Sequence, residues 1–308
     1  MKKGSSTYYW ATAASLFLVM MFNCGVGYYS LSLFVTPITR SFGISNGDFA
    51  LLYVFYGIGS AIAAAALNKL LRKFQLKQLI VFGGAISMTG YLIFSQSHSL
   101  QHMFVGGMLI GASTVFSGTA AVQLIIAKWF WKRRSQITGL VASASGIGTA
   151  IGSPIVGWMI RNLGWRTSCV VLGVLVAVFV CVQVILLLRE QPSCVHLLPY
   201  GAQAAGTGPG EAVQARQEQG IPLREGCRRS CFWLFVGGMI VVAVVYQLIS
   251  LYQSTILIEK GFSEELAALC LSVFAVVDMC SKASAGIIAD RFGFRIVTLY
   301  CAAATASA

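Results

Sequence analysis

Two charged side chains lie four residues apart in an otherwise apolar stretch near the end of the sequence, VVDMCSKASAG at residues 276–286. On a helix this spacing puts Asp278 and Lys282 on one face, where they can pair. A charged group near the centre of a bilayer costs roughly 2.5 to 3.5 kcal/mol on insertion scales, so the pair needs an explanation. Either the pair neutralises itself and holds two helices together, or it presents charge to a polar ligand.

The elements that position this pair are predicted to be membrane-spanning helices. Of the 308 residues, 57% are hydrophobic and 10% are charged, and the mean hydropathy is +0.76. Soluble domains carry about 25% charged residues, so lipid rather than water must cover a protein this apolar. Since an open sheet cannot satisfy its backbone hydrogen bonds in lipid, we predict an all-α membrane protein that crosses the bilayer several times.

Apolar runs long enough to cross a bilayer recur along the chain, because about 20 helical residues span the hydrocarbon core. By this criterion we expect eight full spans, at residues 9–33, 48–68, 78–97, 102–126, 137–160, 167–188, 231–256 and 265–288. A ninth run begins near Ile296 and reaches Ala308, which makes it too short to span.

A polar segment at residues 190–230 separates the sixth span from the seventh. It is rich in Gly, Ala, Gln and charged residues, so we expect a flexible linker that cannot fold alone. The predicted organisation is a six-helix N-terminal bundle at residues 1–189, this linker, and an incomplete C-terminal bundle at residues 231–308. Because the second bundle holds two full spans and part of a third, we expect the chain to be a fragment or a truncated product.

The placement of Lys and Arg predicts the orientation, since cytoplasmic loops are enriched in both. With the N-terminus inside, 17 of the 22 Lys and Arg residues fall in inner segments and 4 in outer loops, and Lys282 is the remaining one. We therefore expect the N-terminus and the linker in the cytoplasm, with the protein in the plasma membrane and the lipid bilayer as its surroundings. The net charge of +12 is split among short loops, so it does not indicate a nucleic-acid partner.

Patterns typical of enzymes and metal sites are missing from the sequence. It contains neither His-Glu-x-x-His nor Gly-x-Ser-x-Gly nor a Walker loop. Cys227 and Cys231 have no histidine nearby to complete a metal site, and His98 and His102 fall in a short outer loop where solvated histidines are expected. We predict a protein that is not an enzyme and that uses no metal or cofactor.

In residues 127–168, AKWFWKRRSQITGLVASASGIGTAIGSPIVGWMIRNLGWRTS, an aromatic pair, a basic pair, spaced glycines, a proline and Gly-Trp-Arg follow one another. This pattern resembles the fourth-to-sixth helix region of major facilitator superfamily transporters, and more narrowly of the monocarboxylate transporter and oxalate:formate antiporter group. Small residues at helical spacing let helices approach closely. They indicate either generic tight packing or a hinge-like helix between two moving bundles, which would give Gly148, Gly152 and Pro154 a role in gating. The superfamily's antiporter motif has no residue between the last glycine and the proline, whereas Ser153 stands there, so symport and antiport both stay open.

A second match is GIIADRFGFR at residues 286–295, which is similar to the loop motif between paired helices of the same superfamily. In that motif an acid and a base form charge contacts that latch one conformation. The resemblance implies gating roles for Gly286, Asp290, Arg291, Gly293 and Arg295. Parallel repeats predict a copy in the first half, and RKFQLK at residues 72–77 is a degenerate copy in which a base replaces the acid.

The stretch that holds the charged pair resembles the eighth-helix signature of monocarboxylate transporters, an Asp followed four residues later by Arg and then by a glycine. Here Lys282 takes the Arg position, without the planar fork that clamps a carboxylate. The resemblance implies that Lys282 supplies the counter-charge for a carboxylate substrate, while Asp278 carries a proton or holds the cation when the site is empty. Further residues predicted to line the cavity are Asn23, Tyr28 and Tyr29 on the first helix and Tyr246 and Gln247 on the seventh.

The implied protein is a secondary active transporter with the major facilitator fold. It would carry small organic anions, monocarboxylates or oxalate- and formate-like anions, by alternating access of two bundles around a midplane site. Its coupled partner would be a proton or a counter-anion. The alternative is a non-transporting membrane protein or an inactive truncated remnant, in which Asp278 and Lys282 form a purely structural pair.

Overall fold

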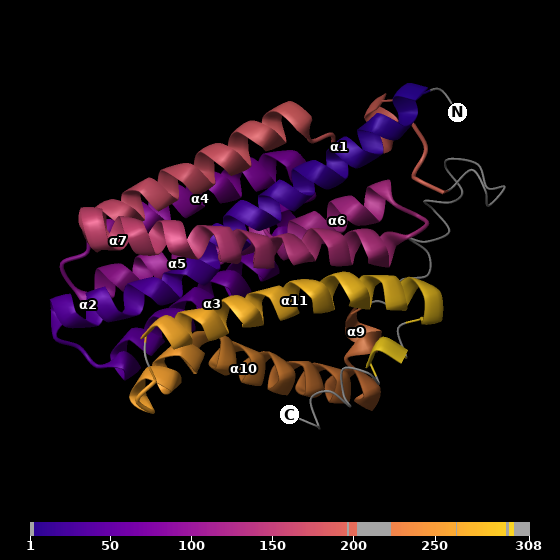
Figure 1. Cartoon of the computed structure of the whole chain (residues 1–308). Coiled ribbons are helices and arrows are strands. Elements are labelled where there is room, and N and C mark those ends of the chain that lie inside the picture. Colours follow the sequence, from indigo (N-terminus) through magenta and orange to yellow (C-terminus); the bar gives the residue numbers. More distant parts are fainter. Residues whose placement is uncertain (1–2, 196, 202–222, 263, 294–295, 299–308) are drawn as a thin grey trace. The chain divides into compact units, whose positions relative to one another are not determined.

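The computed structural model describes residues 3–195, 197–201, 223–262, 264–293 and 296–298. Within these ranges the secondary structure is helical, with no named strand, which confirms the predicted all-α class (Figure 1). The β-type contact found there is an isolated parallel bridge between Phe130 and Tyr200.

The helices follow the apolar runs of the sequence. In chain order they are α1 (Lys3–Val19), the π-helix η1 (Met20–Tyr28), the 3-10 helix η2 (Tyr29–Phe34), α2 (Val35–Phe42), α3 (Asn46–Leu70), α4 (Leu76–Ser95), α5 (Leu100–Phe116), α6 (Thr119–Trp129), α7 (Arg134–Leu187), the 3-10 helix η3 (Pro192–Val195), α9 (Leu223–Gly226), α10 (Ser230–Glu259) and α11 (Glu264–Phe292).

Among the described residues, six helical stretches are long and apolar enough to cross a membrane. They are Tyr8–Phe42, Gly47–Leu70, Leu76–Ser95, Leu100–Trp129, Arg134–Leu187 and Ser230–Gln247. The spans predicted at 137–160 and 167–188 both lie in α7, whose halves meet at the non-helical Gly164 (φ 77°, ψ 159°). The span predicted at 265–288 lies in α11, and residues 299–308 of the ninth run fall outside the described residues.

Two of the predicted spans are less regular than a single α-helix. The first widens into a π-helix over η1, where a Cβ on Gly25 would lie 2.6 Å from the Ser145 carbonyl oxygen of α7. The run predicted at 102–126 is interrupted between α5 and α6 by Gly118 (φ −119°, ψ −140°), where a side chain would clash with the Thr114 carbonyl oxygen. At both places a glycine lets the backbone adopt a geometry or an approach that a Cβ would prevent.

Local capping signals reverse the chain between α2 and α3. Gly43 ends α2 in the left-handed region (φ 64°), which glycine adopts without a Cβ penalty. Ser45 and Asp48 then form a capping box, in which the Asp48 amide donates to the Ser45 hydroxyl and the Ser45 amide donates to the Asp48 carboxylate, each at 3.1 Å. Gly43 thus ends α2, and the capping box of Ser45 and Asp48 starts α3.

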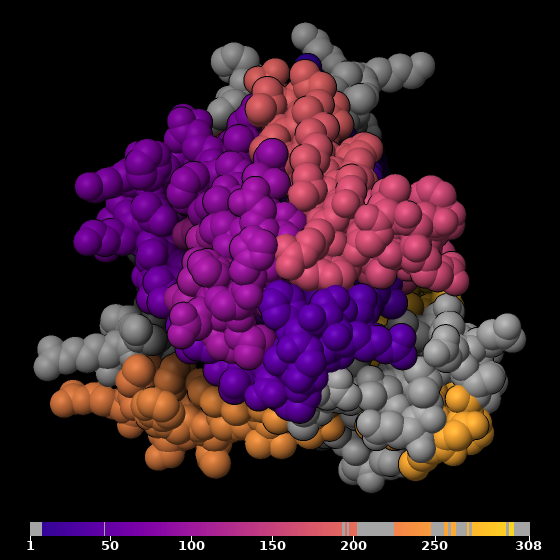
Figure 2. Space-filling model, turned by 90° about the vertical axis from the view of Figure 1, so that its left-hand side faces the viewer, coloured from indigo at the N-terminus to yellow at the C-terminus, as the bar shows by residue number. Residues whose placement is uncertain are grey.

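The chain divides into two compact units, one of residues 1–200 and 275–308 and one of residues 201–274. The core of the first unit contains large side chains with less than 2% exposure, among them Phe34, Tyr91, Phe94 and Trp129. Figure 2 shows the indigo, purple and rose side chains of this unit packed against one another. In the second unit α10 exposes apolar side chains such as Leu234, which is compatible with contact to lipid.

Part of the predicted linker is ordered against the first unit. Val195, Leu197 and Tyr200 pack on its hydrophobic core. Residues 202–222, which make up most of the linker, lie outside the described residues. The boundaries predicted at residues 189 and 230 therefore stay a prediction.

Candidate functional site

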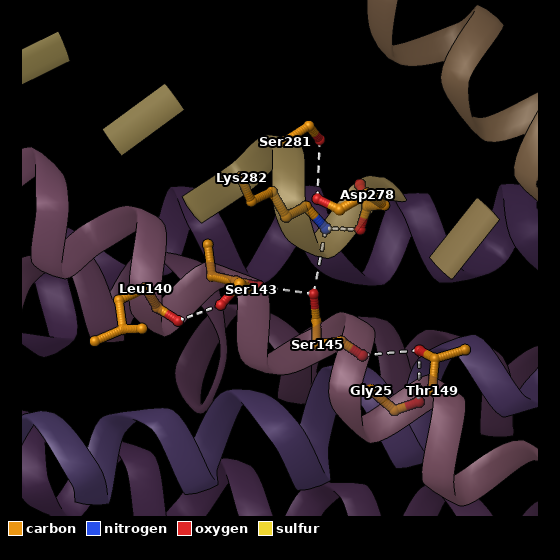
Figure 3. A network of polar contacts seen from close by, with 9 residues as sticks. Gly25, Leu140, Ser143, Ser145, Thr149, Asp278, Ser281 and Lys282 are labelled. Atoms are coloured by element: carbon orange, nitrogen blue, oxygen red, sulfur yellow. Dashed lines mark hydrogen bonds and ion pairs between the residues drawn. The ribbon is translucent and has the colours of Figure 1, made fainter. Parts of the chain in front are cut away.

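Lys282 and Asp278 form the ion pair that their spacing on α11 predicts. The Lys282 Nζ lies 2.5 Å from the Asp278 Oδ2 and 3.2 Å from the Ser145 Oγ of α7 (Figure 3). The Ser145 hydroxyl donates its hydrogen to the Ala142 carbonyl oxygen at 2.8 Å, so it accepts from the ammonium group. The side chains of Lys282 and Asp278 are 28% and 14% exposed, which makes the pair half-buried rather than sealed.

An aromatic cluster from the first helical stretch approaches this ammonium group. The Lys282 Nζ lies 5.9 Å from the ring centroid of Tyr29, within the range of a cation–π contact. The Tyr29 ring is 5.1 Å from that of Tyr28, and Tyr28 stacks on Tyr56 of α3 at 4.6 Å. The Tyr56 hydroxyl lies 2.8 Å from the Thr114 Oγ1 of α5. The structure thus connects Tyr28 and Tyr29 to Lys282 through π contacts.

Asn23 occupies a different place from the tyrosines. Its side chain is 2% exposed, and its amide donates to the Ser117 hydroxyl at the break between α5 and α6. Ser117 in turn donates to the Ser113 carbonyl oxygen at 2.8 Å. Asn23 is therefore a buried polar group whose amide is engaged inside the first unit.

Tyr246 and Gln247 lie on α10 in the second unit. The Tyr246 ring is 6.3 Å from that of Phe274, and both Tyr246 and Gln247 are half-buried. Their part in a substrate cavity stays a prediction.

Glycines bring α11 against the first half of α7. A Cβ on Gly139 would lie 2.5 Å from the Lys282 carbonyl oxygen and 3.0 Å from the Gly286 Cα. Seven residues on, a Cβ on Gly146 would lie 3.0 Å from the Met279 Cβ and 3.1 Å from the Ala275 carbonyl oxygen. The two helices therefore approach closely enough for Lys282 to reach Ser145.

The glycines singled out for gating lie on another side of α7. A Cβ on Gly148 would lie 2.9 Å from the Gly25 Cα, and one on Gly152 would lie 3.1 Å from Val26 Cγ2, both in η1. Pro154 is exposed on α7, and the backbone leaves helical geometry ten residues later, at Gly164. Gly148 and Gly152 thus pack within the N-terminal helices, whereas Gly139 and Gly146, which the sequence left without a gating role, face α11.

Asp290 contacts the first turn of α7. Its carboxylate accepts hydrogen bonds from the amides of Ser135 at 3.2 Å and Gln136 at 2.8 Å. The first amides of a helix have no partner within the helix, and the positive end of the helix dipole favours an anion there. Asp290 therefore caps α7 from α11, although the sequence offered no sign that its partner would be a helix end.

Two further residues of the loop motif, Arg291 and Gly293, lie at the end of α11. Arg291 is exposed in the last turn of α11, and Gly293 follows the helix with φ 83° while its amide donates to the Ala289 carbonyl oxygen at 3.0 Å. A glycine at this position is a common helix end. Arg295 lies outside the described residues.

The Lys282 ammonium group supplies the positive charge of this arrangement. An ammonium group has three N–H donors and can hold more than one acceptor. Within the part of the chain that the structure describes, no group of three or more His, Cys, Asp or Glu side chains could hold a metal ion. Ser145 also belongs to this site, although a serine in a stretch of small residues carries no signal of its own in the sequence.

Known proteins resemble this chain over most of its length. The family model described as Major Facilitator Superfamily matches residues 16–308. Monocarboxylate transporter 12-B of Danio rerio is 22% identical over 303 residues, which cover 92% of this chain and 62% of that protein. Monocarboxylate transporter 12 of Mus musculus is 23% identical over 301 residues, covering 92% and 60%. The chain thus spans about three fifths of the length of these curated relatives.

Solved structures match over most of the chain. The MFS proton:xylose symporter XylE bound to 6-bromo-6-deoxy-D-glucose has a TM-score of 0.64 at 15% identity, covering 94% of this chain and 70% of that chain. A double-tryptophan mutant of XylE gives a TM-score of 0.59 at 17% identity, covering 93% and 69%. At these identities the likeness is one of fold.

Proposed function

The chain belongs to the major facilitator superfamily of membrane transporters, and on this premise we propose that it carries small organic anions across a membrane by alternating access. The family match confirms the predicted fold, the membrane location and the absence of an enzymatic role. The substrates that we propose are monocarboxylates or oxalate- and formate-like anions. The curated relatives named above, which are monocarboxylate transporters, support this class.

The half-buried ammonium group of Lys282 is the observation that carries the proposal. Its acceptors are one carboxylate, Asp278, and one neutral hydroxyl, Ser145. A neutral hydroxyl is a weaker partner than a carboxylate, because charge-assisted hydrogen bonds are shorter and roughly twice as strong. A substrate carboxylate can therefore displace Ser145 from the ammonium group, with the Tyr29 ring beside it.

The net charge of the Asp278–Lys282 pair affects which second ion must be transported together with the substrate. Lys282 and Asp278 together are neutral, so a bound monoanion leaves one net negative charge in a membrane-spanning helix, which is costly. Protonation of Asp278 would remove that charge. Exchange against a second anion would instead carry the same charge in both directions, so that a full cycle transfers no net charge. We propose a proton or a counter-anion as the coupled partner on this ground.

The contact between α7 and α11 suits a latch that opens and closes. Asp290 holds the first turn of α7 through two hydrogen bonds, and Gly286 lies against Gly139 with no side chain on either residue to interlock. We propose that separation of this contact accompanies the change of access, and that Arg291, Gly293 and Arg295 of the loop motif take part in this gating.

Orientation and cavity follow from the sequence. We propose that the N-terminus and the linker are cytoplasmic, in the plasma membrane, and that Tyr246 and Gln247 line the cavity from the second bundle. The surplus of Lys and Arg in the inner segments supports the orientation.

Anion-dependent thermal stabilisation tests the proposed site. A ligand present at 100 times its Kd stabilises the folded state by about 2.7 kcal/mol, which a melting curve detects. We expect formate, lactate or oxalate to raise the Tm of the chain in lipid nanodiscs, and Lys282→Gln to abolish the rise. Glu225→Gln, which removes the acid of an exposed ion pair with Arg229 in the second unit, is the matched control and should keep it.

The variant with both Lys282→Gln and Asp278→Asn separates this function from the structural alternative. If Lys282 binds the anion, the neutral double variant stays unresponsive to formate, lactate and oxalate. If the pair only holds helices together, the double variant regains full stability and the anion response, because neutral replacement of a buried pair is often tolerated. That second outcome would refute a binding role for Lys282.

A further inference from the structure

The segment that follows α7 is fastened to the turn between α6 and α7. We call this segment, residues 189–195 and 197–200, the linker anchor. At its start, the Trp129 indole N–H donates to the Arg189 carbonyl oxygen at 2.9 Å. At its end, the Tyr200 amide donates to the Trp129 carbonyl oxygen at 2.8 Å, and the amides of Trp131 and Lys132 both donate to the Tyr200 carbonyl oxygen at 3.0 Å. Both ends of the linker anchor therefore hold the turn at residues 129–133.

Side chains strengthen this docking. The Tyr9 ring of α1 meets the rings of Trp129 at 5.8 Å and Tyr200 at 5.5 Å, both edge to face, and its hydroxyl donates to the Leu198 carbonyl oxygen. Such aromatic pairs contribute beyond the area that they bury. An ion pair of 2.9 Å joins Lys128 of α6 to Glu190, whose side chain is 17% exposed.

The turn that the linker anchor holds leads directly into the latch. Arg133 has φ 61° and ψ 28°, and it is the non-glycine residue with positive φ among the described residues. This conformation is strained for a residue with a Cβ and persists when surrounding contacts hold it. Ser135 and Gln136, whose amides donate hydrogen bonds to the Asp290 carboxylate, lie two and three residues after Arg133. Their direction depends on the conformation of the turn.

We propose that the linker anchor is a positioning element for the Asp290 latch. Docked, it holds residues 129–133 in the conformation that presents the Ser135 and Gln136 amides to Asp290. Released, it lets Arg133 relax, and the latch weakens. The consequence for transport rests on the proposed alternating access, whereas the coupling between anchor and latch belongs to the resting chain. The linker thereby acts on the contact between α7 and α11 as well as connecting the two halves.

Amide hydrogen exchange at Ser135 and Gln136 tests this coupling. First-turn amides have no partner within the helix, so their protection reports the bond to Asp290. The measurement is mass spectrometry with residue-resolving fragmentation on the whole chain in lipid nanodiscs, and Asp290→Ala sets the rate of the unlatched state. We expect Glu190→Lys, which places two cations together, to accelerate exchange at both amides by about fivefold or more, a usual size for coupling between sites.

Charge reversal provides the rescue. Combining Lys128→Glu with Glu190→Lys restores an ion pair of opposite polarity and should return the exchange rates to those of the unchanged chain. Tyr200→Ala should accelerate exchange as Glu190→Lys does, whereas Tyr200→Phe keeps the ring and the backbone hydrogen bonds and should not. The control Glu225→Lys disrupts the exposed pair with Arg229 in the second unit and should leave both amides unchanged.

Two results would overturn the inference. In one, Glu190→Lys and Tyr200→Ala accelerate hydrogen exchange of the amide at position 200, while the exchange rates of the Ser135 and Gln136 amides stay the same. In the other, amides throughout α4 accelerate as much as those two, which indicates general loosening instead of coupling. Failure of this inference can be told apart from failure of the proposed function. If the anions do not raise the Tm but the variants change the exchange rates of the Ser135 and Gln136 amides as expected, anion binding is refuted and the role of the linker anchor stands.

Discussion

Gly139 and Gly286 meet where α7 packs on α11, so closely that a Cβ on Gly139 would lie 3.0 Å from the Gly286 Cα and 2.5 Å from the Lys282 carbonyl oxygen. Real Cβ atoms do not approach a backbone oxygen to that distance, so the contact requires glycine. The same approach brings the Lys282 side chain within 3.2 Å of Ser145 and the Asp290 carboxylate to the first turn of α7. Packing, the charged pair and the latch therefore depend on one pair of glycines.

Gly139→Ala should weaken this contact. The added methyl group forces α7 and α11 apart, and overpacking of this kind costs about 1–3 kcal/mol. We expect a lower Tm in nanodiscs and faster exchange of the Ser135 and Gln136 amides, measured on the same preparation.

Gly157→Ala is the matched control on the same helix. A Cβ at Gly157 meets no atom within 4 Å, so no contact is disturbed. Replacing a helical glycine by alanine is worth roughly 0.5–1 kcal/mol, so stability should stay the same or rise. Equal losses in Gly139→Ala and Gly157→Ala would show that close approach at Gly139 is unimportant.

The buried hydrogen bond between Asn23 and Ser117 should appear as a coupling energy. Ser117→Ala leaves the Asn23 amide without the acceptor that it uses in the bundle, and an unsatisfied buried donor costs about 1–3 kcal/mol. Asn23→Ala leaves Ser117 still bonded to the Ser113 carbonyl oxygen. The double variant should therefore lose less stability than the two single variants added together, by about 0.5–3 kcal/mol in denaturant unfolding. Strict additivity would mean that the two groups do not interact.

Much of the fold could be predicted because each membrane span is a continuous apolar run of neighbouring residues, which the sequence shows directly. Apolar runs gave the helices, and Gly164 marks the point where two predicted spans join within α7. The two residues after Gly164 hold neighbouring helices in place. The Trp165 indole N–H donates to the Ser41 hydroxyl at 3.1 Å. The Arg166 guanidinium donates to the Ser95 carbonyl oxygen, at the end of α4, at 3.2 Å. A cation there is favoured by the helix dipole.

The parts that escaped prediction depend on contacts between distant segments. Asp278 and Lys282 could be paired from their spacing alone, since four residues make one helical turn. Ser145 could not be added, because its distance to Lys282 depends on how α11 crosses α7. The partners of Asp290 are backbone amides, which every residue possesses and no sequence pattern distinguishes.

The proposed orientation predicts which residues an impermeant thiol reagent can reach. In a chain whose nine native cysteines are replaced, Ser5→Cys and Ala212→Cys should stay unlabelled in intact cells and become labelled after permeabilisation. The reason is the surplus of Lys and Arg in the inner segments, which keeps these on the cytoplasmic side. Strong labelling of either position in intact cells would invert or refute the proposed topology.

Lys282→Arg should keep anion binding while changing its selectivity. The guanidinium group is planar and carries five N–H donors, so it can hold Asp278 and still offer a fork to a carboxylate, whereas the ammonium group is a compact point charge. We expect the affinity for formate to stay within about tenfold, or 1.4 kcal/mol, of the unchanged chain. The ratio of oxalate to formate affinity should change by about the same factor, because a second carboxylate can use the added donors. Isothermal titration calorimetry with both anions measures this ratio, with Lys282→Gln as the non-binding reference.

If Lys282→Arg loses binding as completely as Lys282→Gln, charge at this position is insufficient and the compact ammonium group contacting Ser145 and Tyr29 is itself required. If the ratio stays the same, the side chain at position 282 does not touch the substrate, and the selectivity must be set elsewhere in the cavity.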